Sequence, residues 1–136
     1  MKKSILIAVD LGNAAKVDAL IDHASRYDNG NFKIILLNVV EDIPSWAAVE
    51  LPRGILEKSV QSSLEKLKAL AESSSIEVGV EVRVGHPYKT ILEVADEKSA
   101  ELIIVASHQP ELQNYFLGST AAKVVRHATC SVLVVR

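Results

Sequence analysis

Apolar residues along this chain fall into two kinds of run that alternate from the first residues to the last. Short apolar runs typical of strands occupy residues 5–9, 32–40, 76–84, 102–105 and 132–135. Between them, apolar residues recur every three or four positions, as in amphipathic helices, over residues 14–27, 55–73, 87–99 and 121–128. Strands that alternate with helices pair in parallel through right-handed crossovers. The pattern therefore predicts one α/β domain spanning residues 1–136, with five parallel strands.

The apolar runs differ in a way that indicates where each strand lies. Most are continuous, which is typical of parallel strands covered by helices on both faces of a sheet. Residues 76–84 instead alternate strictly between apolar and polar side chains. Strict alternation indicates one wet face, so we expect this strand at an edge of the sheet.

One connection, residues 41–54, has no regular pattern and contains Pro44, Trp46, Pro52 and Gly54. It is longer than most connections in compact domains. Its tryptophan is positioned either to pack over a ligand or to cap the hydrophobic core, and we favour capping.

Composition narrows the classes of function. A net charge of −2 without basic runs gives no reason to expect a nucleic acid partner. No apolar run approaches the ~20 residues of a membrane helix, and the one that ends at Asp10 is too short for a signal peptide. The single cysteine, Cys130, fits a cytoplasmic location and is expected to be a small core residue. The four histidines show no metal-ligand spacing, so no metal site is predicted within the chain.

Candidate chemistry is concentrated where strands end. Open parallel sheets bind ligands at the carboxyl ends of strands where the strand order reverses, which brings Asp10 toward the loop after residue 105. Gly118 allows close approach of a phosphate, and the helix that follows begins with unpaired N–H groups and the hydroxyls of Ser119 and Thr120. The backbone around Val39 is placed to bind the edge of a base, and Asp10 to accept from a ribose hydroxyl or a base amine.

Each of these residues also has a structural interpretation. Asp10 and Ser119 are residue types that cap helices regardless of ligand. His108 is either a base, a phosphate donor or an exposed loop residue without a role. Lys89 and Lys123 are expected to be solvated.

The chain resembles the universal stress proteins over essentially its whole length. The segments that carry the resemblance are residues 5–10, 36–39, 85–87, 102–108, 117–119 and 124–135. The resemblance implies a Rossmann-like, open parallel sheet of strand order 3-2-1-4-5, a dimer, and adenine-nucleotide binding in one branch of the family.

Nucleotide-binding members carry the motif Gly, two residues, Gly, nine residues, Gly, then Ser or Thr. Gly118 and Ser119 match the last pair, whereas Ala106 and Gln109 replace the first two glycines and the loop is one residue shorter. Ser-His-x-Pro followed by Leu-Gly-Ser is similar to the F/G-type branch, which is associated with ATP or AMP, with or without Mg²⁺. The resemblance places the following residues at the nucleotide: Ala8, Val9, Asp10, Val39, Ala106, Ser107, His108, Gly118, Ser119 and Thr120.

The last strand is expected at a sheet edge. An exposed apolar edge invites pairing with another chain, so we expect a homodimer formed by antiparallel pairing of Val132, Leu133, Val134 and Val135. The alternative is an edge shielded by loops of the same chain.

Three functions stay open. The favoured one is a dimeric regulatory module of the stress response that binds ATP or AMP. An ATP hydrolase or phosphoryl-transfer enzyme ranks lower, because Asp10 is the only carboxylate at the site and the phosphate loop holds no lysine or arginine. The third is an interaction protein that binds no nucleotide.

Overall fold

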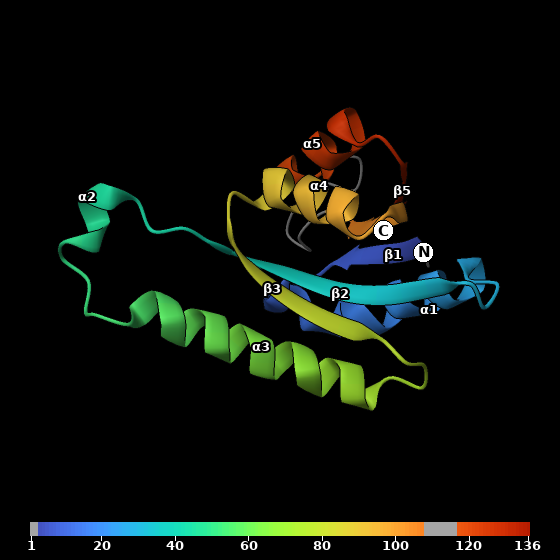
Figure 1. Cartoon of the computed structure of the whole chain (residues 1–136), viewed down its shortest axis with the longest axis horizontal. Coiled ribbons are helices and arrows are strands. Elements are labelled where there is room, and N and C mark those ends of the chain that lie inside the picture. The colour runs from blue at the N-terminus through green and yellow to red at the C-terminus, as the bar shows by residue number, and fades with distance from the viewer. Residues whose placement is uncertain (1–2, 108–116) are drawn as a thin grey trace.

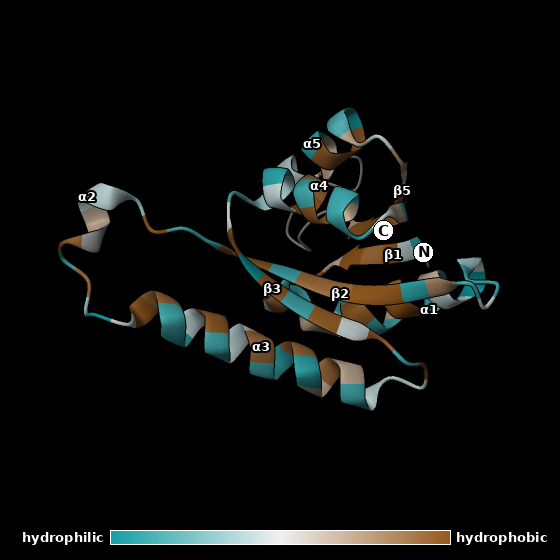
Figure 2. Cartoon of the chain, viewed as in Figure 1, coloured by the Kyte–Doolittle hydropathy of each residue, from teal (hydrophilic) through white to brown (hydrophobic). Residues whose placement is uncertain are grey.

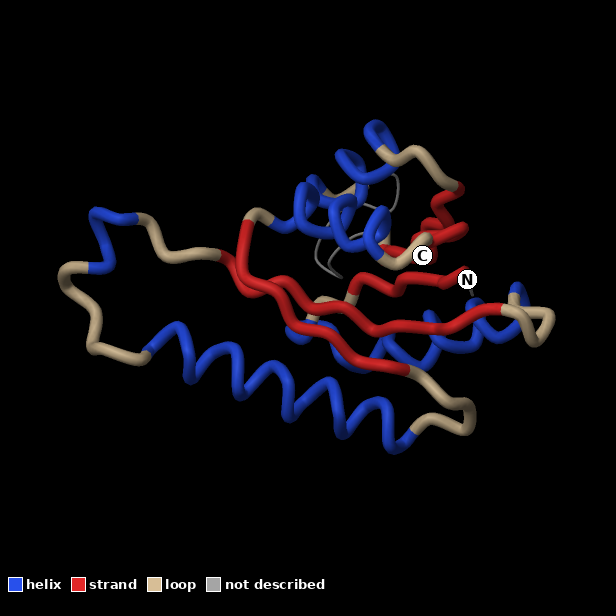
Figure 3. Tube along the Cα trace, viewed as in Figure 1, coloured by secondary structure: helices blue, strands red, loops and turns tan. Residues whose placement is uncertain are grey.

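In the computed structural model, which describes residues 3–107 and 117–136, strands alternate with helices along the chain (Figures 1 and 3). The strands are β1 (Lys3–Ala8), β2 (Phe32–Glu41), β3 (Gly79–Gly85), β4 (Ala100–Ala106) and β5 (Ser131–Val135). The helices are a 3₁₀-helix η1 (Leu11–Lys16), α1 (Val17–Tyr27), α2 (Ser45–Ala48), α3 (Ile55–Ser73), α4 (Pro87–Glu97) and α5 (Ser119–His127).

The strands form a five-stranded sheet of order β3-β2-β1-β4-β5, and every adjacent pair is parallel. The predicted topology is confirmed, with β3 and β5 at the two edges. β1 lies in the middle, paired with β2 through residues 3–8 and with β4 through residues 4–7.

Two separate apolar cores cover the sheet, one on each face. Figure 1 shows α1 and α3 on one side of the sheet and α4 and α5 on the other. Side chains alternate between the faces along each strand, so that Ile5 and Ile7 pack under α1 and α3 while Leu6 packs under α4 and α5. The central strands are hydrophobic along most of their length for this reason (Figure 2). The prediction of helices on both faces is confirmed.

Several element boundaries differ from the predicted ones for local reasons. The first helical segment begins as η1, which is interrupted by the non-helical backbone of Asn13 (φ −131°, ψ 48°), and is α-helical from Val17. The third strand begins at Gly79 instead of Ile76, since the Ile76 N–H is bonded to the Ser74 hydroxyl at 3.2 Å and not to β2.

The polar face of β3 is less open to water than its alternation suggests. The end of α4 lies over it, and Arg83 bridges Glu81 at 2.6 Å and Glu97 at 2.5 Å. Lys98 pairs with the other oxygen of Glu81 at 3.1 Å. The side chains of Glu81 and Arg83 keep 20% and 33% of their exposure, so the face expected to be wet is partly covered by charge-paired side chains.

Trp46 does not cap the core, which corrects the favoured interpretation. It lies in α2, on a segment that leaves the end of β2, projects away from the sheet and returns to α3 (Figure 1). Its side chain is 77% exposed, and Val49 on the same segment is 87% exposed. Cys130, by contrast, is half-buried against the core under α4 and α5, as expected. Within residues 3–107 and 117–136, no helix is long and apolar enough to span a membrane.

We predict that Gly85→Ala destabilises the fold by about 1–3 kcal/mol. A Cβ atom at Gly85 would lie 2.5 Å from Oγ1 of Thr90, a buried side chain on α4. Urea denaturation measures the unfolding free energy of each variant. Gly79→Ala is the matched control, because a Cβ at Gly79 on the same strand meets only ordinary contacts at 3.8 Å and beyond. Equal unfolding free energies for the two variants would contradict the close contact.

We also predict that Glu97 makes the unfolding free energy depend on pH. The hydrogen bond from Arg83, and then its charge, lower the pKa of the Glu97 carboxyl in the folded chain. A carboxyl with a lowered folded pKa stabilises the fold above its unfolded pKa, and this contribution is lost as the pH falls through the folded value. Unfolding free energy measured from about pH 7 to about pH 3 should fall less in Glu97→Gln than in the wild-type chain.

Glu93→Gln is the control for that measurement, because Glu93 is an exposed carboxyl on the same helix. Its pH profile should follow the wild type. A Glu97→Gln profile that overlays the wild-type one would show that the ion pair makes no contribution to stability.

Candidate functional site

A cavity of about 120 Å³ opens at the carboxyl edge of the sheet, where the strand order reverses around β1. Strand ends and the first turns of α4 and α5 surround it, as expected for a ligand site in an open parallel sheet. The lining residues are Ala8, Val9, Asp10, Leu37, Val39, Pro87, Ile91, Val105, Thr120 and Ala121. The volume is below the ~300 Å³ of a typical complete ligand pocket, so the cavity suits one part of a ligand whose remainder lies outside.

Asp10 lies at the mouth of this cavity and also caps the helix that follows. Its Oδ1 atom accepts a hydrogen bond from the Gly12 N–H at 2.9 Å. A Cβ atom at Gly12 would lie 3.2 Å from the same oxygen, so glycine keeps this turn tight. The side chain is exposed. Capping and ligand contact are therefore compatible at Asp10, because Oδ2 makes no hydrogen bond within the part of the chain that the structure describes.

The end of β2 presents backbone groups to the same cavity. The last paired residues of β1 and β2 are Ala8 and Leu37, and the Val9 N–H donates to the Leu37 carbonyl at 2.8 Å. Backbone groups alternate in direction along a strand, so those of Val39 point the same way as those of Leu37. They therefore face the space beyond the end of β1. Asn38 shapes this opening, because its Nδ2 atom donates to the Val9 carbonyl at 2.9 Å.

The start of α5 provides a set of backbone donors. Gly118 is the N-cap, and the Ala122 N–H donates to its carbonyl at 2.9 Å. The N–H groups of Ser119, Thr120 and Ala121 precede that first helical bond and have no partner within the helix. No side chain among the described residues caps them. Gly118 itself has φ −57° and ψ 153°, a backbone conformation that does not require glycine.

Ser107 supports the site without lining it. It is 4% exposed, its N–H donates to the Val135 carbonyl at 2.9 Å, and its carbonyl accepts from the Gly118 N–H at 2.5 Å. These bonds join the end of β4 to the end of β5 and to the start of α5. Ala106, which pairs with Val135, likewise lies at the end of β4 and outside the cavity wall.

Five of the ten predicted residues thus line one cavity: Ala8, Val9, Asp10, Val39 and Thr120. Gly118 and Ser119 begin the adjoining helix, Ser107 is bonded to Gly118, and Ala106 pairs with Val135 of β5. His108 lies outside the described residues, so its predicted role is untested.

Sequence reasoning missed the apolar walls of the cavity. Pro87 and Ile91 come from the first turns of α4, and Leu37 and Val105 from the strands beneath. Their types are those of ordinary core residues, and only the packing of α4 beside α5 brings them to the same opening. Asn38 was also missed, although a polar residue within an apolar strand run is a signal that sequence could have offered.

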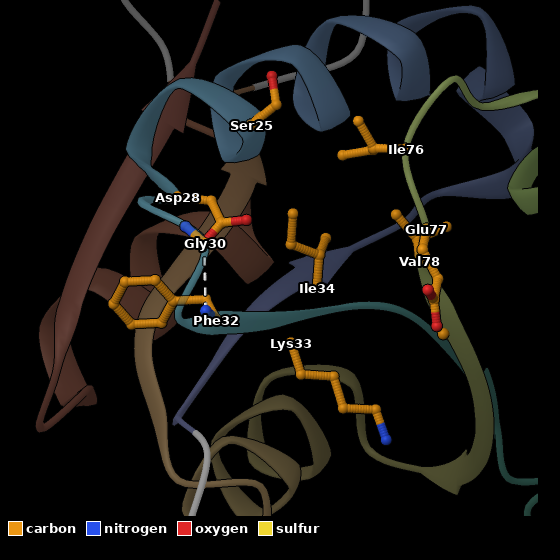
Figure 4. Close-up of a pocket in the computed structure, with 10 residues that line it drawn as sticks. Ser25, Asp28, Gly30, Phe32, Lys33, Ile34, Ile76, Glu77 and Val78 are labelled. Atoms are coloured by element: carbon orange, nitrogen blue, oxygen red, sulfur yellow. Dashed lines mark hydrogen bonds between the residues drawn. The ribbon is translucent and has the colours of Figure 1, made fainter.

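A larger hollow of about 410 Å³ lies at the opposite, amino edge of the sheet, between the end of α1 and the start of β3. Figure 4 shows that its polar groups do not converge: the Ser25 hydroxyl points away from the hollow, and the Lys33 side chain leaves it along the other side of β2. Ser25 is bonded to the Asp22 carbonyl, and Asp28 to the N–H groups of Gly30 and Phe32. The smaller cavity is therefore the better candidate.

The chemistry of the site is that of binding. Apolar walls suit a flat ring, Asp10 and the Val39 backbone suit polar ring or sugar groups, and the amides of α5 suit an anion. Among the described residues, no group of three or more His, Cys, Asp or Glu side chains could hold a metal ion.

Comparison with known proteins agrees with this fold. The model of the universal stress protein family matches residues 1–136. The chain is 32% identical over 145 residues to Universal stress protein G of Salmonella typhimurium, with 100% of both chains covered. It is 31% identical over 140 residues to Universal stress protein MJ0531 of Methanocaldococcus jannaschii, covering 98% of this chain and 82% of that one.

Solved structures show the same architecture. Hypothetical protein MJ0577 superposes with a TM-score of 0.79 at 24% identity, covering 99% of this chain and 96% of that one. A universal stress protein solved in complex with cAMP has a TM-score of 0.61 at 20% identity, covering 98% and 96%. The universal stress protein from Archaeoglobus fulgidus, in complex with dAMP, has a TM-score of 0.61 at 17% identity, with 100% of both chains covered. With its family model matched from end to end, this chain belongs to the universal stress protein family.

Proposed function

We propose that the protein binds an adenine nucleotide, ATP or AMP, at the cavity on the carboxyl edge of the sheet. The observation that carries the proposal is the position of the cavity directly beside the first turn of α5, because Thr120 and Ala121 belong to both. A ring held in the cavity leaves an attached phosphate beside unpaired helical N–H groups.

Each part of the nucleotide has a counterpart in the site. The apolar walls, including Ile91 and Val105, accept the adenine ring. The backbone N–H and C=O of Val39 complement the donor and acceptor on the edge of the base. Asp10 accepts from a ribose hydroxyl or a base amine. The N–H groups and hydroxyls of Ser119 and Thr120 receive the phosphate.

The family comparisons support the ligand class. Two proteins of the same fold were solved with cAMP and with dAMP, and both ligands are adenylates. Mg²⁺ would accompany ATP, held mainly by the phosphate oxygens. Asp10 is the carboxylate that lines the cavity, and its Oδ1 atom is already bonded to Gly12, so the described part of the site offers little to hold the ion by itself.

A regulatory module fits this arrangement better than an enzyme does. Phosphoryl transfer relies on a positioned base and on concentrated positive charge. Among the described residues that line the cavity, Asp10 is the one ionisable side chain. We therefore propose that nucleotide occupancy is the signal. Because β5 lies at an edge of the sheet, we also propose that the protein acts as a homodimer.

Nucleotide addition should stabilise the folded chain. At about 100 times the dissociation constant, a ligand that binds only the folded state raises the unfolding free energy by about 2.7 kcal/mol. Gly118→Asp should abolish this increase in urea denaturation with ATP or AMP, because it sets a carboxylate against the phosphates. Ser62→Asp, on the exposed face of α3, is the matched charge control and should retain the increase.

The same protein distinguishes the alternatives. Steady phosphate release from ATP would indicate an enzyme. No stabilisation by either nucleotide, with none co-purifying, would indicate an interaction protein that binds no nucleotide and would refute the site.

The proposed dimer can be tested at β5 without breaking the sheet. The Ser107 N–H donates to Val135, so the backbone groups of Val135 and Leu133 point toward β4 and those of Val132 point outward. Val132→Pro therefore removes an outward N–H and should leave a folded monomer, whereas Val132→Thr should remain dimeric. Analytical ultracentrifugation measures the mass of each variant in solution. A Val132→Pro variant that stays dimeric would show that the interface is not at β5.

A further inference from the structure

Lys123 has an aromatic neighbour that orients its ammonium group against the first turn of α4. It lies in the second turn of α5, and its Nζ atom is 5.2 Å from the centre of the Tyr88 ring. Tyr88 belongs to the first turn of α4 and directly follows Pro87, which lines the cavity. The expectation that Lys123 is merely solvated is therefore incomplete.

The Tyr88 ring is fixed from two sides. His86 meets its edge, with ring centroids 4.9 Å apart at 88°, and His127 stacks on it at 5.7 Å and 25°. Tyr88 is half-buried and packs against the core under α4 and α5. The position of the ring is thus fixed by packing, and the flexible side chain of Lys123 lies against it.

Lys123 also lacks a neutralising partner. In the described part of the chain, ion pairs involve Lys3, Arg26, Arg83 and Lys98, and no carboxylate lies within 4.0 Å of the Lys123 ammonium. A contact with an aromatic face orients a cation while leaving its N–H donors available. The ammonium group is positioned and still free to bind an anion.

Helix periodicity places Lys123 on the same face of α5 as Ser119, where the phosphate is proposed to bind. Lys123 is four residues after Ser119, so the two side chains are neighbours on one face of α5. Ser119 is the first residue of the helix and carries one of its unpaired N–H groups. At this spacing the two Cβ atoms are about 5–6 Å apart, so a lysine side chain is long enough to extend toward phosphates attached to one bound at the helix start.

We propose that Lys123, oriented by Tyr88, binds the phosphates beyond the first and so makes the site prefer ATP to AMP. This inference rests on the proposed function and adds the determinant of nucleotide choice. Ala106 at the end of β4 and Gln109 after it stand in place of two glycines of the family motif, which leaves fewer close backbone contacts to a phosphate chain. The charge of a lysine stabilises bound phosphates where close backbone contacts of the missing glycines are lost.

Isothermal titration of ATP and of AMP into the purified protein tests the proposal. Lys123→Met should weaken ATP binding about tenfold, as expected for loss of one charge-assisted contact, and change AMP binding less than about twofold. Lys123→Arg keeps the charge and should retain most of the preference for ATP. Tyr88→Phe keeps the ring and should behave like the wild type, whereas Tyr88→Leu should lose part of the preference.

Lys89→Met is the matched control, because it removes the same charge from an exposed position on the first turn of α4. It should leave the ratio of ATP to AMP affinity unchanged. An equal loss of ATP affinity in both variants would show a diffuse charge effect and overturn the proposal, as would equal losses for ATP and AMP in Lys123→Met. Wild-type protein that binds neither nucleotide would refute the proposed function itself, whereas binding without any effect of Lys123 would refute this inference alone.

Discussion

The position of β1 between β2 and β4 is the constraint on which the site depends. Chain connections from β1 to β2 and from β3 to β4 cross opposite faces of the sheet, which leaves an opening where the two directions meet. β1 pairs with β2 only as far as Ala8, while β2 continues to Glu41. The unequal lengths expose the backbone of Val39 at the carboxyl edge. The Asn38 amide donates to the Val9 carbonyl and so ties the chain to β2 as it leaves the end of β1.

A second set of bonds fixes the opposite wall. Ser107 connects the end of β4 to Val135 and to Gly118, so the start of α5 is attached to the sheet and not only to the loop before it. The buried position of Ser107 protects these bonds from water. Ser107, which the resemblance places at the nucleotide, thus also attaches the start of α5 to the sheet.

Sequence predicted the elements whose cause is local and missed those whose cause is tertiary. Continuous apolar runs gave the central strands, because burial on both faces requires them. Trp46 was misplaced since nothing in the pattern of residues 41–54 says whether the segment folds back onto the core. Pro87 and Ile91 read as ordinary helix residues, and only the packing of α4 beside α5 turns them into cavity walls. The ion pair of Arg83 with Glu97 was not predicted either, because only the packing of α4 against β3 brings the two residues together.

The composition of the site favours recognition over reaction. Most of the cavity wall is apolar, and its polar groups are backbone groups, the Asp10 carboxylate and the Thr120 hydroxyl. Amide dipoles at a helix start stabilise a resting phosphate as well as a reacting one, so they lower the energy of bound nucleotide without selecting a transition state. Catalysis needs charge that is placed where it develops during the reaction. These groups therefore suit the binding of an anionic ligand better than its reaction, which is the reason for proposing a regulatory role.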